Sequence, residues 1–482
     1  MEGLSDQAAA EQICARIDWK YLLGLDLDYA GFDASVLSEF RKRLIEKQAD
    51  ERLFEKPLSR MREVGFVKER GQQRTDSTHV LAAIRSLNRL ELAGETVRQA
   101  LNHLAVVGSL WLASWAPAEW IEHYSSRIED AKLPKKESER KALIQTIGED
   151  GTKLLTALYD EKTPDYLKQL PAVEVLRQVW IQQYQWVEGQ ICWRESGNVP
   201  PAAIMINSPY DPEARFSRKR TITWTGGKAH LTESCDPGLP HLLTHIETTT
   251  ATEPDCQTLP KIHAALAVKQ LLPAEHLIDS GYMDIDNQVD SQMIHKVELM
   301  GPMRPDTSPQ ARAQNGYDIA HFVIDWQAQS VTCPQGKTSE VWSVPLDPNK
   351  EQSVSVRFNK QDCLACPVRA LCTQAKSGPR GLHLQPSAHK QQTLQQARLN
   401  QLQPQFKERY NLRAGIEGTI SQAVRAFELR RTRFIGDTKT RLQHLATGAA
   451  INFSRLAAWF RNPNLAKTRT SAFADLAPLL AL

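Results

Sequence analysis

Residues 221–232, which read TITWTGGKAHLT, mark the point at which the hydrophobic pattern of the chain changes. From residue 84 to about residue 193 apolar residues recur at helical intervals, whereas here they alternate with polar residues, as in a strand with one buried face. Gly226 and Gly227 divide the stretch, so we expect two strands joined by a tight turn. The stretch therefore predicts a sheet that follows a long helical segment.

Further strands and helices surround this stretch. The other predicted strands lie at 75–80, 241–248, 276–279 and 297–300, and the helical stretches between the later ones lie at 258–272 and 285–295. Their order predicts a mixed α/β core that is similar in outline to the ribonuclease H-like arrangement. A long helical region from about 387 to 461 completes the chain.

The chain of 482 residues is too long for one ordinary domain, since a domain usually has about 100–200 residues. With 41% hydrophobic and 24% charged residues, the composition is that of a folded protein. No stretch approaches the ~18 consecutive apolar residues of a membrane span, and the first residues lack the pattern of a secretion signal. We therefore expect a cytoplasmic protein that has no membrane partner. The predicted segments are an N-terminal helical domain (1–70), a first core strand (71–83), a helical insertion (84–200), a ribonuclease H-like core (201–330), a Cys-rich insert (331–376) and a C-terminal helical region (377–482).

Two aspartates stand where open α/β sheets place functional groups. Asp279 ends an apolar strand and is followed by Ser280 and Gly281, which allows the backbone to turn sharply. Asp76 lies in a similar setting, although Ser77 beside it also fits an ordinary capping or turn aspartate. Both are candidates for a functional carboxylate.

A third acidic residue lies in the helical segment 410–418, which reads YNLRAGIEG. On a helix, Tyr410, Arg413 and Glu417 share one face, which is compatible with a surface salt bridge beside a packed tyrosine. Gly415 and Gly418 indicate more than a surface salt bridge, because each glycine in a helix interior lowers the stability of the helix by about 1 kcal/mol. Such a cost is understandable if the helix must press closely on a neighbouring element.

This segment resembles the DDE transposases of bacterial insertion sequences. In those enzymes one helix carries a Tyr, then an Arg after two intervening residues, a Glu after three more and a Lys after six more. Tyr410, Arg413 and Glu417 fit this spacing. Val424 stands at the lysine position with Arg425 next to it, so the phosphate contact of the lysine is either moved to Arg425 or absent.

The resemblance extends from about residue 18 to residue 462. Its further matches are the segments 75–80, 208–215, 224–230 and 279–282. Many relatives have Gly-Tyr-Lys where this chain has Gly226, Gly227 and Lys228. The resemblance includes a cysteine segment before the glutamate, which marks one subgroup of these transposases.

The resemblance implies that Asp76, Asp279 and Glu417 form a catalytic triad that binds two Mg²⁺ or Mn²⁺ ions. Asp211 is the alternative for the first position, because the long helical stretch after Asp76 is an unusual interruption of such a fold. The resemblance also implies double-stranded DNA partners, namely the ends of the element and its target, with a homodimer acting on DNA in the bacterial nucleoid. The N-terminal helical domain is a candidate for recognition of the element ends.

The expected chemistry agrees with these residue types. Two metal ions about 3.5–4 Å apart can activate the nucleophile, stabilise charge on the phosphate and stabilise the leaving oxygen. Mg²⁺ keeps several waters and needs only one or two protein carboxylates beside substrate phosphate. No Gly-rich phosphate loop is evident, which fits a reaction that takes its energy from the phosphodiester and needs no ATP.

Basic residues follow the predicted catalytic helix, although the net charge is only +3. Such a run is commonly a solvated helix face, but beside a site that processes phosphates we expect it to contact the DNA backbone. A second basic group, 215–220, precedes the predicted strand pair. The expected DNA contacts are Tyr410, Arg413, Arg425, Arg430, Arg431, Arg433 and Lys439, and Arg441 belongs to the same run.

Four of the eight cysteines cluster within 40 residues, namely Cys333, Cys363, Cys366 and Cys372. Four thiolates with one Cys-x-x-Cys pair suit a tetrahedral structural zinc site, and the alternative is four reduced, partly buried cysteines. The aromatic group Trp180, Tyr184, Trp186 and Trp193 is expected to pack within the helical insertion rather than to stack on bases.

Two other functions share these features. A metal-dependent nuclease with the same core would cut DNA but would not join a 3′-hydroxyl to a target. A DNA-binding derivative of a transposase would have lost catalysis, and the presence of Asp76, Asp279 and Glu417 argues against it.

Overall fold

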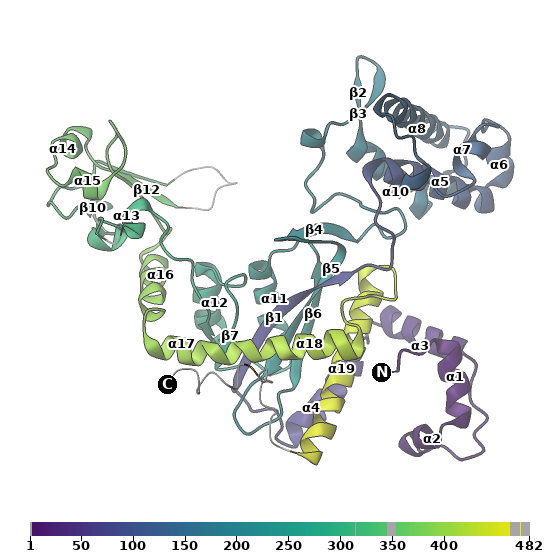
Figure 1. Cartoon of the computed structure of the whole chain (residues 1–482), viewed down its shortest axis with the longest axis horizontal. Helices are drawn as coiled ribbons and strands as arrows, with labels where there is room; N and C mark the ends of the chain where they lie inside the picture. Colours follow the sequence, from purple (N-terminus) through teal and green to yellow (C-terminus); the bar gives the residue numbers. More distant parts are fainter. Residues whose placement is uncertain (1, 314, 345–352, 463–472, 474–482) are drawn as a thin grey trace.

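The computed structural model describes residues 2–313, 315–344, 353–462 and 473, so parts of the predicted segments 331–376 and 377–482 lie outside it. A central sheet with packed helices carries two lobes, which stand apart at the upper right and upper left of Figure 1. The sheet strands are β1 (Gln72–Leu81), β4 (Arg215–Lys219), β5 (Ile222–Ser234), β6 (Leu243–Thr250), β7 (Glu275–Leu277) and β8 (Glu298–Met300).

The sheet is mixed, as the sequence predicts. Strands β1, β4 and β6 pair with β5 in antiparallel fashion, whereas β7 pairs in parallel with both β1 and β8. The resulting order β6-β5-β1-β7-β8, with β4 also on β5, is consistent with a ribonuclease H-like transposase core. The helices of this core are α11 (Asp255–Val268), α12 (Ile285–His295), α18 (Gly415–Phe427) and α19 (Asp437–Arg461).

One hydrophobic cluster joins the sheet to these helices. Its buried members include Leu231 and Ile246 from the sheet, Ile262 from α11, Ile416 from α18 and Leu445 from α19. Burying such side chains gives about 1.5–3 kcal/mol each, so the C-terminal helices are held to the sheet mainly by this cluster. Segments far apart in the sequence are thereby fixed against one another.

The predicted turn at Gly226 and Gly227 is wrong, because both glycines lie within the continuous strand β5. A Cβ atom on Gly226 would lie 2.1 Å from the carbonyl oxygen of Val80, and one on Gly227 would lie 2.7 Å from that of Thr249. The glycines therefore allow close approach of neighbouring strands rather than reversal of the chain. The reversal lies between β4 and β5, where Arg220 has φ 56°.

The N-terminal part is helical, with α1 (Asp6–Ala15), α2 (Ile17–Leu23), α3 (Ser35–Glu46) and α4 (Arg52–Glu63). Phe54 of α4 is fully buried in the core cluster. Arg441 of α19 forms ion pairs with Asp50 and Glu51 at the start of α4. Helix α4 is therefore part of the core packing, whereas Tyr21 and Leu22 of α2 are 89% and 80% exposed.

The insertion after β1 has its own hydrophobic cluster and forms the upper right lobe of Figure 1. Its helices are α5 (Arg89–Val107), α6 (Ser109–Ala113), α7 (Trp120–Tyr124), α8 (Glu137–Leu158), α9 (Asp165–Lys168) and α10 (Pro171–Gln183). The helical prediction fails at its end, where β2 (Tyr184–Val187) and β3 (Gln190–Trp193) form a hairpin. Glu188 and Gly189 both have positive φ, which is the geometry of a tight hairpin turn.

The aromatic group of the insertion is divided by this hairpin. Trp180 stacks on Tyr184 with 4.8 Å between ring centroids, and Trp193 meets Tyr184 edge-on at 4.9 Å. The packing prediction is confirmed for these three. Trp186 is 65% exposed, so it does not share this buried packing.

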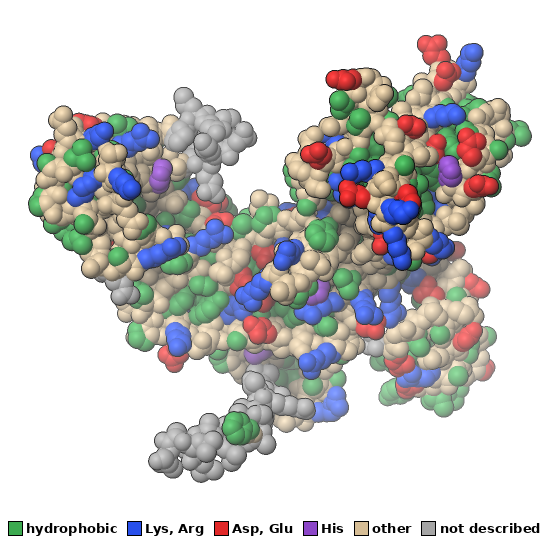
Figure 2. Space-filling model, turned by 45° about the horizontal axis from the view of Figure 1, so that its top comes forward, with side chains coloured by type: hydrophobic (Ala, Val, Ile, Leu, Met, Phe, Trp, Pro, Cys, Tyr) green, Lys and Arg blue, Asp and Glu red, His purple; other side chains and the backbone are tan. Residues whose placement is uncertain are grey.

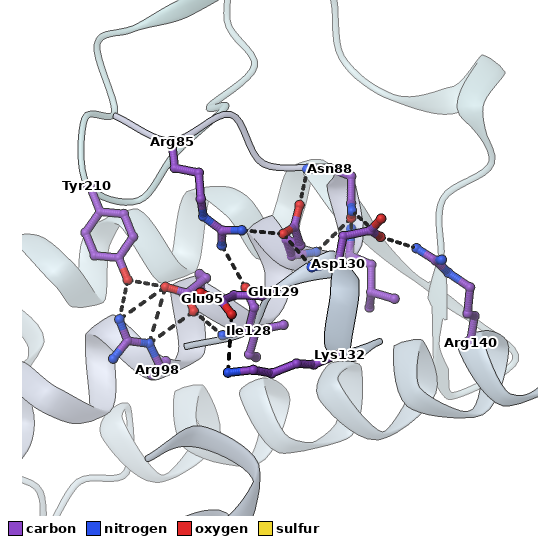
Figure 3. Close-up of polar contacts among 12 residues, drawn as sticks. Arg85, Asn88, Glu95, Arg98, Ile128, Glu129, Asp130, Lys132, Arg140 and Tyr210 are labelled. Carbon is purple, nitrogen blue, oxygen red and sulfur yellow. Dashed lines mark hydrogen bonds and ion pairs between the residues drawn. The ribbon is translucent and has the colours of Figure 1, made fainter. Parts of the chain in front are cut away.

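A buried polar network joins the insertion to the chain that returns to the sheet (Figure 3). Glu95 of α5 is 1% exposed and accepts hydrogen bonds from the Arg98 side chain and from the backbone N–H of Ile128. Tyr210 contacts both Glu95 and Arg98 through its hydroxyl group. The insertion is thus fastened to the segment that leads into β4.

The upper left lobe contains the cysteine segment and packs around Phe322, Val331, Val356 and Leu382. This cluster includes residues on both sides of the predicted 331–376 segment. Its elements are β9 (Val323–Asp325), β10 (Ser330–Thr332), β11 (Val341–Ser343), β12 (Val354–Arg357), α14 (Lys360–Leu364), α15 (Arg369–Cys372) and β13 (Gly381–Leu384), with α13 (Pro309–Arg312) before them. Helices α16 (Ala388–Asn400) and α17 (Pro404–Asn411) lead back to the sheet.

Among the described residues, no helix combines the length and the apolar character needed to cross a membrane.

Candidate active site

Two aspartates lie on neighbouring parallel strands of the sheet. Asp76 belongs to β1, and Asp279 follows the end of β7 by two residues. The Asp279 carboxylate accepts a hydrogen bond from the Gly281 N–H at 2.6 Å, which fixes the sharp turn after the strand. The side chains of Asp76 and Asp279 are 14% and 24% exposed, so both are only partly open to solvent.

Arg413 connects these aspartates with the glutamate of the helical segment. Its Nη2 atom lies 3.2 Å from Oδ2 of Asp76 and 3.9 Å from Oδ2 of Asp279. Its Nη1 atom lies 3.6 Å from Oε1 of Glu417, whose side chain is 69% exposed. Three carboxylates that are distant in the sequence therefore face one guanidinium group.

The charges at this point are strongly coupled. Burial raises the pKa of Asp76, Arg413 acts against this rise, and the nearby Asp279 adds to it. The positive charge of Arg413 therefore favours the ionised form of Asp76 against the effects of burial and of Asp279. Arg413 is itself only 13% exposed, and its Nε atom is buried without a hydrogen-bond partner.

A 3₁₀ turn precedes the helix that carries Glu417. The turn, Leu412–Ala414, separates α17 from α18. A Cβ atom on Gly415 would lie 2.1 Å from Nη1 of Arg74, so the expectation of close packing is confirmed there. It is wrong for Gly418, because no heavy atom lies within 4 Å of the Cβ position.

Tyr410 stands on α17, ahead of the turn. Its ring stacks on Phe406 with 5.8 Å between centroids and packs against Leu277 and Met300 at the end of the sheet. Burial raises its pKa. The tyrosine is half-buried, and Asp76, Asp279 and Glu417 lie near enough to contribute to this rise.

A buried charge network lies beneath the 3₁₀ turn. Glu233 of β5 is fully buried and accepts hydrogen bonds of 2.6 Å from Arg74, Arg455 and Thr419. Arg74 also donates a hydrogen bond of 2.6 Å to the backbone oxygen of Leu412. Burial alone would raise the pKa of Glu233, but the two arginines outweigh it and hold the pKa below its usual value. This network could not be predicted from the sequence, since its members belong to no single motif.

A fourth carboxylate lies close to the three. Asp255, at the start of α11, accepts hydrogen bonds from Lys228 at 2.8 Å and from Ser77 at 3.3 Å. A Cβ atom on Gly281 would lie 2.9 Å from Oδ1 of Asp279 and 3.2 Å from Oδ2 of Asp255. Asp255 was not among the residues predicted from the sequence, although the comparison of Gly226, Gly227 and Lys228 with Gly-Tyr-Lys of relatives concerned this part of the sheet.

Asp211 lies in different surroundings from Asp76. It is 4% exposed and accepts a hydrogen bond of 3.4 Å from the Gly436 N–H at the start of α19. Burial raises the pKa of Asp437 to about 6, and the nearby Glu213 and Asp211 contribute to the rise. Within the described part of the chain, no hydrogen bond or ion pair joins Asp211 to Arg413.

The predicted DNA-contacting residues divide into two groups. Arg425 and Arg430 line a cavity of about 380 Å³ together with Asp76 and Glu417. Arg430 is held there by a hydrogen bond of 2.8 Å from its Nε to Oγ1 of Thr78. Basic side chains are spread over the central part of the face shown in Figure 2.

The other basic residues lie farther along the chain. Arg431, Arg433 and Lys439 are exposed, and Arg433 pairs with Glu428 at 3.3 Å. Arg441 forms ion pairs with Asp50 and Glu51 of the N-terminal part. In the second basic group, Lys219 lies near enough to lower the pKa of Asp76, so this group borders the same site.

The four clustered cysteines line one cavity of about 280 Å³ in the upper left lobe. Burial raises the pKa of Cys372, and the other three thiols add to the rise. Across residues 2–313, 315–344, 353–462 and 473, no three His, Cys, Asp or Glu side chains are arranged to hold a metal ion together. Neither the four cysteines nor the carboxylates around Arg413 are so arranged.

Comparison with known families finds two matching segments. Residues 332–457 match the transposase DDE domain, and residues 1–43 match a transposase domain (DUF772). The first segment contains Arg413 and Glu417, and the two segments together cover about a third of the chain. Comparison with the curated proteins and with the solved structures finds no match.

The class that these matches support is a DDE transposase. A transposase DDE domain implies DNA transposition, and this family uses divalent metal ions.

Proposed function

We propose that this chain is the transposase of an insertion sequence, which binds the element ends as a homodimer, cleaves them and joins them to target DNA. The observation that carries the proposal is the approach of Asp76, Asp279 and Glu417 to one guanidinium group. Asp76 and Asp279 come from separate strands and are only 14% and 24% exposed, and burying charged groups is costly, so their cluster with Arg413 and the exposed Glu417 is a candidate functional site. Asp76, Asp279 and Glu417 are the proposed catalytic residues.

The donor set suits Mg²⁺ or Mn²⁺, since hard divalent cations prefer carboxylate oxygens. Asp76 and Asp279 would hold the ions from the sheet, and the more exposed Glu417 would hold them from α18. Two ions bound there would supply charge stabilisation at the phosphate and at the attacking and leaving oxygens.

The chain's own residues would bind and orient the DNA. Arg425 and Arg430 line the cavity beside the carboxylates, and a guanidinium group can hold a phosphate through two parallel hydrogen bonds. The half-buried Tyr410 would support the DNA backbone from the other side of Arg413. Arg431, Arg433, Lys439 and Lys219 would extend the contact along the duplex, which makes binding dependent on salt.

A strand-transfer assay on DNA that carries the element ends tests this proposal. Asp279→Asn and Glu417→Gln should abolish cleavage and joining in Mg²⁺, while binding to the ends remains. Glu428→Gln is the matched control, because Glu428 is an exposed acid at the end of the same helix and pairs with the exposed Arg433. Full cleavage by either triad variant would overturn the proposal. Cleavage without joining by the unaltered protein would identify a nuclease instead.

The first aspartate can be assigned by comparing Asp76→Asn with Asp211→Asn. Asp76 contacts Arg413, whereas Asp211 caps the start of α19, so the first variant should be inactive and the second should retain activity. If Asp211→Asn alone removes activity from a folded protein, the first position belongs to Asp211.

The zinc site is a separate proposal for Cys333, Cys363, Cys366 and Cys372. Its support is that all four line one small cavity, although their sulfur atoms would have to rearrange to share an ion. Structural zinc contributes its binding free energy to folding, so Cys366→Ser should lower both zinc content and the melting temperature. Cys192→Ser is the control, since Cys192 lies in the β2–β3 hairpin of the other lobe. Protein purified without chelator that contains no zinc would refute the site.

A further inference from the structure

Arg413 lies where a cation between the proposed catalytic carboxylates would be expected. Its two terminal nitrogens are 3.2 Å from Asp76, 3.9 Å from Asp279 and 3.6 Å from Glu417. None of these distances is that of a short, optimal charge-assisted hydrogen bond, which is about 2.7–2.9 Å. The guanidinium group therefore donates one hydrogen bond, to Asp76, and reaches Asp279 and Glu417 only as longer ion pairs.

A divalent ion and Arg413 would compete for the oxygens of the same carboxylates. Mg²⁺ requires its oxygen ligands at about 2.0–2.1 Å in octahedral geometry, and it brings two positive charges into the space that the guanidinium group faces. Arg413 and the metal would then repel each other across a partly buried site, where such repulsion is poorly screened. Metal binding should therefore weaken the hold of the carboxylates on Arg413.

The surroundings allow Arg413 to change partners. Its backbone lies in the 3₁₀ turn Leu412–Ala414 between two helices, and its buried Nε atom has no hydrogen-bond partner. The cavity that contains Asp76 and Glu417 is lined by Arg425 and Arg430, so a DNA phosphate drawn to these side chains would arrive close to Arg413.

We propose that Arg413 competes with the divalent metal for the carboxylates in the free protein and is released to a DNA phosphate when the metal binds. This inference rests on the proposed function, because it takes the triad to be the metal site. Arg413 neutralises the acids before the metal arrives and neutralises phosphate afterwards. Since coupling between two ligands is reciprocal, metal should then tighten DNA binding and DNA should tighten metal binding.

The test measures Mn²⁺ affinity of the full chain without DNA, from the electron paramagnetic resonance signal of free Mn²⁺. Arg413→Gln removes the competing charge and should bind Mn²⁺ about tenfold more tightly than the unaltered protein. Arg413→Lys keeps the charge and should stay within about threefold of the unaltered protein. Arg425→Gln is the matched control, because Arg425 lines the same cavity and has no ion pair with the triad among the described contacts.

The outcomes separate this inference from the proposed function. Asp279→Asn should lose the Mn²⁺ site, and if it binds Mn²⁺ as the unaltered protein does, the triad is not the metal site and the proposed function fails. If Asp279→Asn loses the site but Arg413→Gln gains no affinity, the proposed function stands and competition by Arg413 is refuted. An equal gain in Arg425→Gln would also refute it, since the effect would then be general electrostatics.

A second measurement needs no variant and so does not depend on folding of Arg413→Gln. Phenylglyoxal modifies accessible guanidinium groups, and mass spectrometry can follow Arg413 separately from Arg425. Mn²⁺ should speed modification of Arg413 at least about twofold while leaving Arg425 unchanged. Unchanged or slower modification of Arg413 at saturating Mn²⁺ would overturn the proposal.

Discussion

Replacing Glu233 with glutamine removes the only negative charge between two buried arginines described in this network. Glu233 is 0% exposed, and its partners Arg74 and Arg455 are 6% and 17% exposed. Breaking a buried ion pair by removing one partner costs about 3–5 kcal/mol, because the remaining charge is left uncompensated. The variant should fall at the lower end, since the glutamine oxygen can still accept one hydrogen bond and Arg74 keeps the Leu412 carbonyl oxygen.

The loss of stability in Glu233→Gln should be confined to part of the chain as well as large. Thr419 and Leu412 tie the network to α18 and to the turn that carries Arg413, so hydrogen exchange should speed up in β5 and α18 before the insertion is affected. Hydrogen exchange measured by mass spectrometry gives the free energy of opening segment by segment, which suits a chain with several hydrophobic clusters. Glu417→Gln is the control and should change stability by less than about 0.5 kcal/mol, since its side chain is exposed. A loss below about 1 kcal/mol for Glu233→Gln would refute the reasoning.

Other outcomes follow from the same structure. Gly415→Ala should destabilise α18 by about 1–3 kcal/mol because its Cβ meets a buried guanidinium group, whereas Gly418→Ala should stabilise the helix by up to about 1 kcal/mol because its Cβ position is open. Thermal unfolding of the two variants decides this, and equal effects would contradict the packing argument. Acid should destabilise the core, because burial lowers the pKa of His263 and of His444 to about 4 and holds that of His276 well below its usual value. The stability that depends on these neutral histidines is complete above about pH 6.5 and is lost as the pH falls toward 4, because the unfolded chain then binds more protons. The loss should be about 3 kcal/mol for each of His263 and His444. Urea unfolding at intervals across this range should show the decline, and a flat profile would contradict it.

The sequence could predict the features that depend on local pattern. The strands at Asp279 and at 297–300 were recognisable from their apolar runs and the one at Asp76 from its β-like composition, and the spacing of Arg413 and Glu417 predicted that their side chains meet. The mixed sheet followed from the order of these elements. Local pattern was sufficient for β7 and β8 because each is a short apolar strand between turn or loop residues.

The features that the sequence did not predict depend on pairing between distant segments. The pair Gly226-Gly227 has the composition of a turn, and only the approach of Val80 and Thr249 explains its place inside a strand. Glu233 is separated from Arg455 by more than two hundred residues, so no periodicity could reveal their contact. The β2–β3 hairpin was missed for a different reason, since its strands have four residues each and follow a strong helical pattern.

The charges around the proposed site differ in how firmly they are held. Asp255 has a close partner in Lys228, whose Nζ atom also contacts the backbone oxygen of Glu253, so this pair is a fixed part of the structure. Arg413 instead divides its charge among three carboxylates at 3.2–3.9 Å and leaves Nε without a partner. A side chain that is partly buried yet poorly satisfied gains more from a new partner than a well-paired one does. In the proposed site, Asp255 therefore keeps its lysine, whereas Asp76, Asp279 and Glu417 share a cation that we expect a metal ion to replace.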